Sequence, residues 1–229
     1  DSSTSRGLGD VYKRQVKWYA KSSGTTNDKS KFIPVSAEGL KRIHYQGGTD
    51  VVALYLKNNP KSRMFDGKGL ILGGSHSPNY NLSGSLVGDL SAILIENINP
   101  LVNLVRTPKK QTALLSDFEV KRDRIAHETL KQNVTNLSGV PSWMLSVLVR
   151  VLEISGKKHI NEVWPNLEVF FHGGIAFTPY RPQYEQIITS PNMHYMETYN
   201  ASEGFFGIQD DPNDKSVSYT HLTLPTNRE

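Results

Sequence analysis

Apolar residues recur at helical spacing in several stretches that are separated by glycine, proline and asparagine. Because side chains three or four positions apart share one face of a helix, this spacing predicts amphipathic helices. Two stretches also carry boundary signals, since Ser36 suits an N-cap and Gly156 suits the end of a helix that begins at Pro141. The predicted helices cover residues 36–58, 85–97, 116–133, 141–155 and 179–189.

Short apolar runs lie between the predicted helices and end in glycine or polar residues. They are typical of buried strands and cover residues 69–74, 167–171 and 193–199. Strands and helices that alternate at this spacing indicate βαβ units. We therefore predict an α/β fold with a mainly parallel sheet and flanking helices. The polar segment 75–85 is predicted to be a loop that forms one wall of a substrate site.

The two ends of the chain share a coding pattern. Residues 10–15 can be encoded by a DNA string whose reverse complement, in another frame, encodes residues 217–221. A match of this length looks like a sequencing adapter translated together with an insert. We expect residues 1–15 and 217–229 to be non-native ends that pack poorly, and residues 16–216 to be an internal fragment of a longer protein.

Composition narrows the classes of function. The chain has 229 residues, of which 37% are hydrophobic and 21% charged, as in ordinary globular proteins. The net charge of +4 is small and dispersed, which argues against a nucleic-acid partner. The absence of cysteine excludes disulfides and thiolate zinc sites, and the seven histidines show no close paired spacing. The longest apolar run, residues 143–152, is too short to span a bilayer, so we expect no membrane partner and a cytoplasmic location.

A loop rich in hydroxyl side chains is the first candidate for binding chemistry. A glycine turn frees backbone amides for phosphate oxygens, hydroxyl groups add donors, and the lysines that follow add charge. The loop is not a Walker A motif, because no second glycine precedes Lys29 and Ser30. A solvated surface turn explains the same composition equally well. The residues of this loop are Ser22, Ser23, Gly24, Thr25 and Thr26.

Further motifs follow this loop in a fixed order. Together with it they resemble the adenylate-forming superfamily and, in detail, the auxin-responsive acyl acid–amido synthetases of the GH-three family. Each motif alone is weakly specific, but the ordered set covers essentially all of residues 16–216. The motifs are Lys31-Phe32-Ile33-Pro34, Gly139-Val140-Pro141-Ser142-Trp143, Phe177-Thr178-Pro179-Tyr180 with Gln183-Tyr184, and Tyr199-Asn200-Ala201-Ser202-Glu203.

The resemblance implies that residues 22–26 hold the phosphates of ATP. Many relatives carry glycine where Asn27 and Asp28 stand here, and a carboxylate beside phosphate is unfavourable unless it turns away or faces Mg²⁺. Gly173 and Gly174 would let the backbone approach the nucleotide or the acyl group closely. From the local residues alone, an ordinary turn at the end of a strand is an equally good interpretation.

The resemblance also implies a nucleotide site at the end of the last predicted strand. Tyr199, with Asn200 and Ala201 beside it, would cover the adenine face. Ser202 and Glu203 would act at the phosphates, and Glu203 would hold Mg²⁺, because a carboxylate is a hard oxygen ligand. Without the resemblance, core packing of Tyr199 is an equally good interpretation, and a polar loop is the better one for Ser202 and Glu203.

The reaction implied by the resemblance is acyl activation. A carboxylate attacks the α-phosphorus of ATP and pyrophosphate leaves. An amine, expected to be an amino acid, then attacks the acyl carbon and displaces AMP. This chemistry needs positioning and charge neutralisation more than a side-chain nucleophile. Loop 75–85 and the helices within residues 117–155 are the candidate walls of the acyl pocket.

The chain departs from the resembled family by being incomplete. A preceding N-terminal region, a later Gly-Asp motif that binds the ribose, and a small C-terminal domain are expected outside it, so the fragment alone should be inactive. Three alternatives remain open on the sequence. They are an acyl-CoA ligase of the same superfamily, a phosphate-loop kinase or NTPase, and a non-catalytic nucleotide-binding module.

Overall fold

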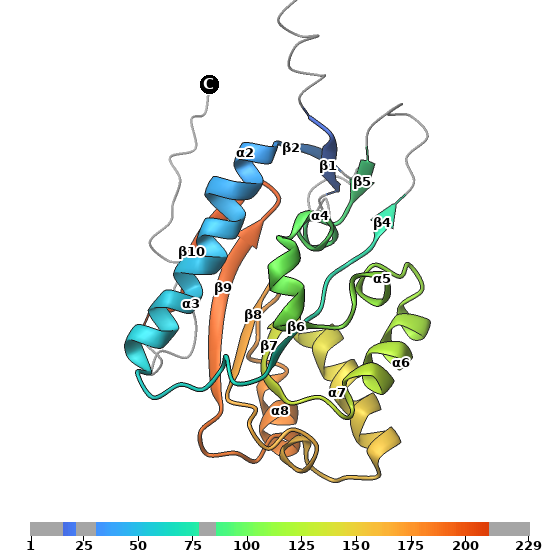
Figure 1. The fold of residues 1–229 in the computed structure, drawn as a ribbon, viewed down its shortest axis with the longest axis vertical. Coiled ribbons are helices and arrows are strands. Elements are labelled where there is room, and N and C mark those ends of the chain that lie inside the picture. The colour runs from blue at the N-terminus through green and yellow to red at the C-terminus, as the bar shows by residue number, and fades with distance from the viewer. Residues whose placement is uncertain (1–15, 22–30, 78–85, 211–229) are drawn as a thin grey trace, which may run out of the picture.

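The computed structural model describes residues 16–21, 31–77 and 86–210, and a six-stranded sheet forms its centre (Figure 1). All neighbouring strands of this sheet are parallel except the last two of the chain, which form an antiparallel hairpin. The predicted α/β fold with a mainly parallel sheet is therefore confirmed. In spatial order the strands are β10 (Gly204–Ile208), β9 (His194–Ala201), β8 (Val169–Gly173), β7 (Val134–Gly139), β3 (Lys68–Ile71) and β6 (Arg106–Thr107).

A second sheet of four short strands lies beyond the first one (Figure 1). It contains one parallel pair and two antiparallel pairs. The sequence did not predict this sheet, because strands of two to four residues are too short to show an alternating pattern. Its strands are, in spatial order, β2 (Phe32–Val35), β1 (Trp18–Lys21), β5 (Leu86–Gly88) and β4 (His76–Ser77).

Helices cover both faces of the six-stranded sheet. On one face, α6 (Phe118–Thr129), α7 (Pro141–Ser155) and α8 (Arg181–Ile187) pack in one large apolar cluster. On the other face, α3 (Gln46–Asn58) packs on β8, β9 and β10. A smaller cluster joins α4 (Leu90–Asn97) to the four-stranded sheet. The remaining helices are α2 (Ala37–Gly39), a π-helix (Leu40–Tyr45), α5 (Lys110–Ala113) and two 3₁₀ helices (Pro100–Leu104 and Ile160–Glu162).

Helix α7 shows how the sequence specifies the core. Its apolar spacing predicts a buried stripe of Leu145, Leu148, Val149 and Leu152, and this stripe is displaced in the structure: Leu148 is fully buried, Leu145 and Leu152 are half-buried, and Val149 is 42% exposed. The fully buried side chains also recur at helical spacing, but each lies one position before a predicted one. Each such side chain stabilises the fold by about 1.5–3 kcal/mol relative to an exposed one. Pro141 occupies the first turn, where no backbone donor is needed, and Gly156 ends the helix in the left-handed conformation at φ 68°. The buried residues of the stripe are Met144, Val147, Leu148 and Val151.

Other predicted helices are confirmed with adjusted ends. Ser36 caps the helical segment that runs from α2 through the π-helix into α3, and its Oγ accepts a hydrogen bond from the Gly39 N–H at 3.0 Å. Asp117 caps α6 in the same way. Helix α6 ends at Thr129, because the chain turns there toward β7. The polar residues of β7 interrupt its apolar pattern, so the sequence did not predict this central strand.

One predicted helix is partly wrong. Residues 85–97 do not form a continuous helix, because Leu86–Gly88 is strand β5 and the helix begins only after Asp89. Buried Val87 packs within the four-stranded sheet, so pairing with β1 overrides the local helical spacing there. In the described part of the chain, none of the helices has the length and apolar character needed to cross a bilayer. The predicted non-native ends, residues 1–15 and 217–229, lie outside the described residues.

Candidate active site at the carboxyl edge of the sheet

The parallel strands β3, β7, β8 and β9 all end at one edge of the six-stranded sheet. In parallel α/β sheets this carboxyl edge is where ligands bind. The residues that follow β8 and those that end β9 are neighbours there, because Gly173 pairs with Thr198 in the register of the two strands. The structure thus places Gly173-Gly174 beside the part of β9 that precedes Tyr199, and β9 continues from there to the turn at Ser202 and Glu203.

The two glycines after β8 serve different purposes. A side chain on Gly173 would place its Cβ 2.3 Å from the main-chain oxygen of Thr198, so close packing against β9 requires glycine there. Gly174 is exposed and has φ 86°, a left-handed conformation that favours glycine. Of these two glycines, Gly174 therefore presents the more exposed backbone at the edge, where a ligand could approach it.

Tyr199 stands near the end of β9 with its ring 38% exposed. Its ring lies 5.3 Å from the ring of Phe206 on β10, measured between centroids. The pairing of the two strands is irregular between Phe205 and Gly207, which leaves Phe206 as the extra residue of a bulge. A partly exposed aromatic ring near the end of β9 can cover a planar base, and this role of Tyr199 stays a prediction.

Ser202 and Glu203 form the turn of the hairpin between β9 and β10. Ser202 is half-buried and Glu203 is exposed. Within the described ranges, no three histidine, cysteine or acidic side chains are close enough to form a metal cluster. Mg²⁺ is nevertheless commonly held by one or two carboxylates together with substrate phosphates, so an exposed single carboxylate fits that use. The loop formed by Ser22, Ser23, Gly24, Thr25 and Thr26 lies outside the described residues, and its distance from Glu203 stays a prediction.

Asn200 is tied to a helix on the other face of the sheet. Its side-chain oxygen lies 2.9 Å from Nδ1 of His44, which is buried within the π-helix. Burial lowers the pKa of His44, while the hydrogen bond to Asn200 acts in the opposite direction. Asn200 and Ala201 belong to β9, so the predicted motif is a strand end that continues directly into the hairpin turn.

His172 is a buried polar group at the end of β8. It is 2% exposed, it stacks on Phe177 with ring centroids 4.2 Å apart, and its Nδ1 has no hydrogen-bond partner. Burial, with a smaller contribution from the positive charge of Arg181, lowers its pKa to about 3. The imidazole is therefore neutral, and one unpaired ring nitrogen lies next to the Gly173-Gly174 turn.

A buried lysine supports the end of β3. Lys121 on α6 is 3% exposed, and its ammonium donates hydrogen bonds to the main-chain oxygens of Gly73 at 3.1 Å and Gly74 at 2.9 Å. Burial lowers its pKa, and the carboxylate of Asp89 partly offsets that effect. Asp89 in turn accepts from the Ser75 N–H at 3.0 Å. This network fixes the turn that connects β3 to the four-stranded sheet.

The geometry can be compared with known proteins. Residues 11–193 match the GH3 family N-terminal domain. The chain belongs to the GH3 family. The match ends before Tyr199, so the hairpin motif extends the resemblance beyond the matched residues. No curated protein matches this GH3 chain.

Solved structures with a similar fold include two amido synthetases. A GH3.15 acyl acid amido synthetase is similar at 16% identity, with a TM-score of 0.67, over 92% of this chain and 46% of the other. The AtGH3.15 complex with 2,4-DB gives the same identity and score over 91% and 48%. ATP-bound MatB from Rhodopseudomonas palustris is more distant, at 17% identity and a TM-score of 0.43 over 83% and 30%. The GH3 chain spans about half the length of the synthetases that it matches.

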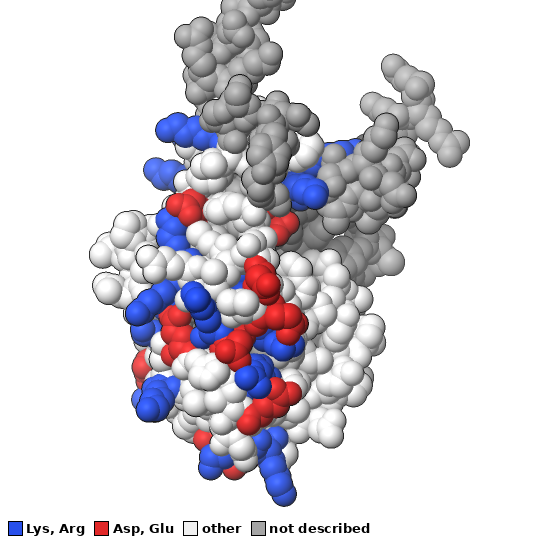
Figure 2. Space-filling model, turned by 90° about the vertical axis from the view of Figure 1, so that its right-hand side faces the viewer, with Lys and Arg blue, Asp and Glu red and all other residues white. Residues whose placement is uncertain are grey.

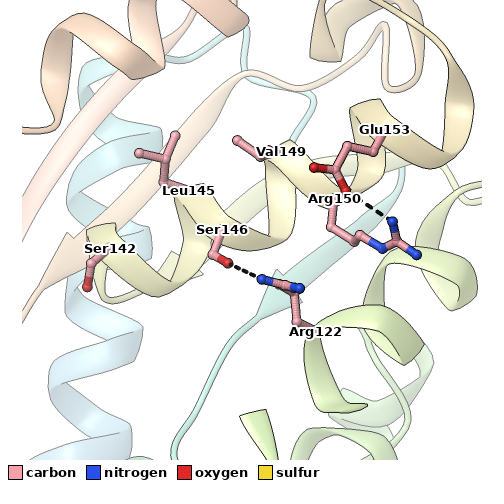
Figure 3. A pocket seen from close by; sticks show the side chains of 7 residues that line it. All are labelled: Arg122, Ser142, Leu145, Ser146, Val149, Arg150 and Glu153. Atoms are coloured by element: carbon pink, nitrogen blue, oxygen red, sulfur yellow. Dashed lines mark hydrogen bonds and ion pairs between the residues drawn. The ribbon is translucent and has the colours of Figure 1, made fainter. Parts of the chain in front are cut away.

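A shallow hollow of about 300 Å³ lies between α6 and α7 of the GH3 chain (Figure 3). It falls within the helices predicted to line the acyl pocket. Arg122 and Ser146 face each other across it, with the Arg122 Nη1 3.3 Å from the hydroxyl oxygen. Arg150 bonds to Asp123 at 2.7 Å and to Glu153 at 3.0 Å, so this cation is already neutralised. Whether the hollow receives an acyl group stays a prediction.

Charges on the surface formed by α5 and α6 are mixed. Figure 2 shows basic and acidic residues side by side there, without a broad cationic area among the described residues of this face. Pairs such as Lys110 with Glu96, 2.6 Å apart, account for this pattern. Such a surface lacks the extended positive potential that nucleic-acid binding requires.

Sequence reasoning missed three buried polar residues of the GH3 chain: His44, Lys121 and His172. A signal existed for two of them. Lys121 stands four positions before buried Ile125, which places it on the inward face of α6. His172 directly precedes the two glycines at the end of a predicted strand. His44 had no such signal, because its partner Asn200 is 156 positions away.

Proposed function

We propose that this chain is part of an ATP-dependent ligase that activates a carboxylic acid as an acyl-adenylate and transfers the acyl group to an amine. The observation that carries the proposal is the conjunction of the GH3 family match with the adjacent strand ends at Gly174 and Tyr199. The GH3.15 relatives are described as acyl acid amido synthetases, and one of them holds 2,4-DB, an acyl acid. A small carboxylic acid is thus the proposed substrate, and an amino acid is the proposed acceptor.

The chain's own residues suit three tasks in that reaction. The exposed backbone at Gly174 and the ring of Tyr199 would hold the nucleotide base. The hydroxyl of Ser202 would donate to a phosphate oxygen. Glu203 would hold Mg²⁺, which neutralises phosphate charge when it is bound. The Ser/Thr-rich loop, residues 22–26, would supply further phosphate donors.

Acid-dependent exchange of pyrophosphate into ATP tests the proposal. The complete enzyme that contains this region should catalyse the exchange, and it should release AMP and pyrophosphate rather than ADP. Glu203→Gln keeps the shape of the side chain and removes the charge, so exchange should fall by about 100-fold. High Mg²⁺ should restore part of it.

The matched control is Glu185→Gln, which removes an exposed carboxylate that lies 3.7 Å from Arg181 on α8. It should exchange pyrophosphate like the parent enzyme. Glu203→Gln that adenylates normally at low Mg²⁺ would contradict the metal role. ADP as the product would instead indicate a kinase, and an acyl thioester formed in place of an amide would indicate an acyl-CoA ligase.

A further inference from the structure

His44 makes a buried contact with β9, the strand that carries Tyr199 of the proposed nucleotide site. The contact is on the face of the sheet opposite to the Tyr199 side chain. Successive residues of a strand point to opposite faces, so Asn200 faces α3 while Tyr199 faces away from it. His44 is 5% exposed, and its Nδ1 is 2.9 Å from the side-chain oxygen of Asn200. With that oxygen as acceptor, Nδ1 carries the hydrogen, which fixes both the tautomer of the ring and the orientation of the amide.

The backbone around His44 is unusual. Leu40–Tyr45 is a π-helix between two α-helical segments, and π-helical turns are rare and often occur at functional sites. At the start of the π-helix, Leu40 packs with Ala20 and Ile93 at the four-stranded sheet. After it, Val51 packs on the six-stranded sheet. His44 therefore stands where one continuous helical segment passes from one sheet to the other.

The same helical segment touches the hairpin at a second point. A side chain on Gly47 would place its Cβ 2.4 Å from the ring of Phe205 on β10, so the helix and β10 pack at a distance that only glycine allows. Tyr45, next to His44, bonds elsewhere, because its hydroxyl donates to the main-chain oxygen of Leu94 at 2.8 Å. His44 and Gly47 therefore contact the hairpin of β9 and β10, whereas Tyr45 contacts α4.

We propose that His44 is a positioning residue for the nucleotide site. It holds the end of β9 through Asn200, and so keeps Tyr199 and the turn at Ser202 and Glu203 in place for the nucleotide. This rests on the proposed function for its kinetic consequence, although the link between His44 and the hairpin does not. His44 itself touches no substrate in this proposal.

Kinetics of the complete synthetase test the proposal. His44→Leu should raise the KM for ATP about 3- to 10-fold, the loss expected for one hydrogen bond, and leave the KM for the acid unchanged. His44→Gln retains an N–H donor and should recover part of that loss. Tyr45→Phe is the matched control, because it removes one hydrogen bond from the same π-helix without touching the hairpin, and its KM for ATP should stay at the parent value.

A double-mutant cycle isolates the pair. Asn200→Leu should raise the KM for ATP to the same extent as His44→Leu, and the double variant should be no worse than either single one. Asn200→Asp keeps an acceptor oxygen and should be milder. Additive effects of the two leucine variants, or an unchanged KM for ATP in His44→Leu, would overturn the proposal.

Amide hydrogen exchange in the 229-residue chain supplies a readout that does not need activity. His44→Leu should speed exchange at residues 199–203 about 10-fold, and Tyr45→Phe should leave those amides at the parent rate. Unchanged exchange in His44→Leu would overturn the link between His44 and the hairpin. A complete enzyme without acid-dependent exchange of pyrophosphate would instead overturn the proposed function, so the two failures are distinguishable.

Discussion

The two ends of the parallel strands use polar side chains in opposite ways. At the amino ends of β8 and β9, Glu168 accepts hydrogen bonds from the Tyr55 hydroxyl at 3.1 Å, from the Arg63 N–H at 2.9 Å, and from the Ser62 hydroxyl. His194 Nδ1 lies 2.9 Å from the same Tyr55 oxygen. In this amino-end cluster, formed by Tyr55, Ser62, Arg63, Glu168 and His194, the polar groups satisfy one another.

The carboxyl ends show a different arrangement. His172 has a buried ring nitrogen without a partner, Glu203 is exposed in a turn, and Gly174 offers bare backbone in the left-handed conformation. Of these features, the unpaired buried nitrogen of His172 costs stability in the folded chain. The comparison indicates that the amino-end cluster contributes stability, whereas the carboxyl ends carry Gly174 and Glu203, two exposed residues that the proposed function assigns to a ligand. A fold can therefore contain polar groups at one edge whose arrangement does not maximise its stability, as long as other regions supply that stability.

Breaking the amino-end cluster should give the largest loss of stability. Glu168→Ala removes the acceptor of three hydrogen bonds, so the free energy of unfolding should fall by about 3 kcal/mol. Urea unfolding of the 229-residue chain measures this. Arg63→Ala is the control. Its main-chain N–H still reaches Glu168, and its side chain only pairs with Asp66 at the surface, so stability should change by less than about 0.5 kcal/mol. Equal losses in the two variants would contradict the account of the cluster.

The carboxyl edge should respond to acid through His172. Its pKa of about 3 lies below the ordinary value of 6.5, so below pH 6.5 the unfolded chain binds a proton that the folded chain does not. The free energy of unfolding should therefore decrease as the pH falls, by about 2 kcal/mol between pH 6.5 and pH 5. His172→Phe should remove this part of the pH dependence, measured by urea unfolding at both pH values. The same dependence in His172→Phe and the parent would assign it to other groups.

Two glycines in the left-handed conformation allow a further comparison, with smaller expected effects on the free energy of unfolding. Gly174→Ala at the carboxyl edge and Gly156→Ala after α7 should each reduce the free energy of unfolding by about 1 kcal/mol, because alanine is strained at positive φ. On the proposed function, only Gly174→Ala should raise the KM for ATP of the complete protein. Thermal unfolding and steady-state kinetics give the two measurements. An equal rise of KM in Gly156→Ala would show that strain alone, and not the position at the edge, affects the nucleotide.

Much of the fold could be predicted because its longer elements follow simple periodicity. The two ends of α7 and the apolar run of β8 can be predicted without tertiary information, whereas the face of α7 that is buried was predicted one position too late. Strand β7 could not be predicted, because Thr135, Asn136 and Ser138 interrupt its apolar positions although it lies at the centre of the sheet. The glycine at position 47 weakens the predicted helix locally, and only the contact with Phe205 explains its presence.

The candidate site was predictable as a set of motifs and not as a set of contacts. Gly174 follows β8 and Tyr199 lies near the end of β9, so their placement at the same edge follows from a parallel sheet. The packing need at Gly173 and the pairing of His44 with Asn200 depend on the spacing between elements, which no local pattern encodes. The placement of the Ser/Thr-rich loop relative to Glu203 stays a prediction.

The strand order also has a kinetic meaning. Strands β7, β8, β9 and β10 are adjacent in space in the order in which they occur in the chain. Helix α7 connects β7 to β8, helix α8 connects β8 to β9, and both pack on the sheet. Contacts between segments close in sequence form quickly, so residues 134–208 should assemble first. Strand β3 must then close a long loop to pair with β7. During synthesis the amino-terminal half therefore leaves the ribosome first but waits, incompletely folded, for the half that completes its sheet.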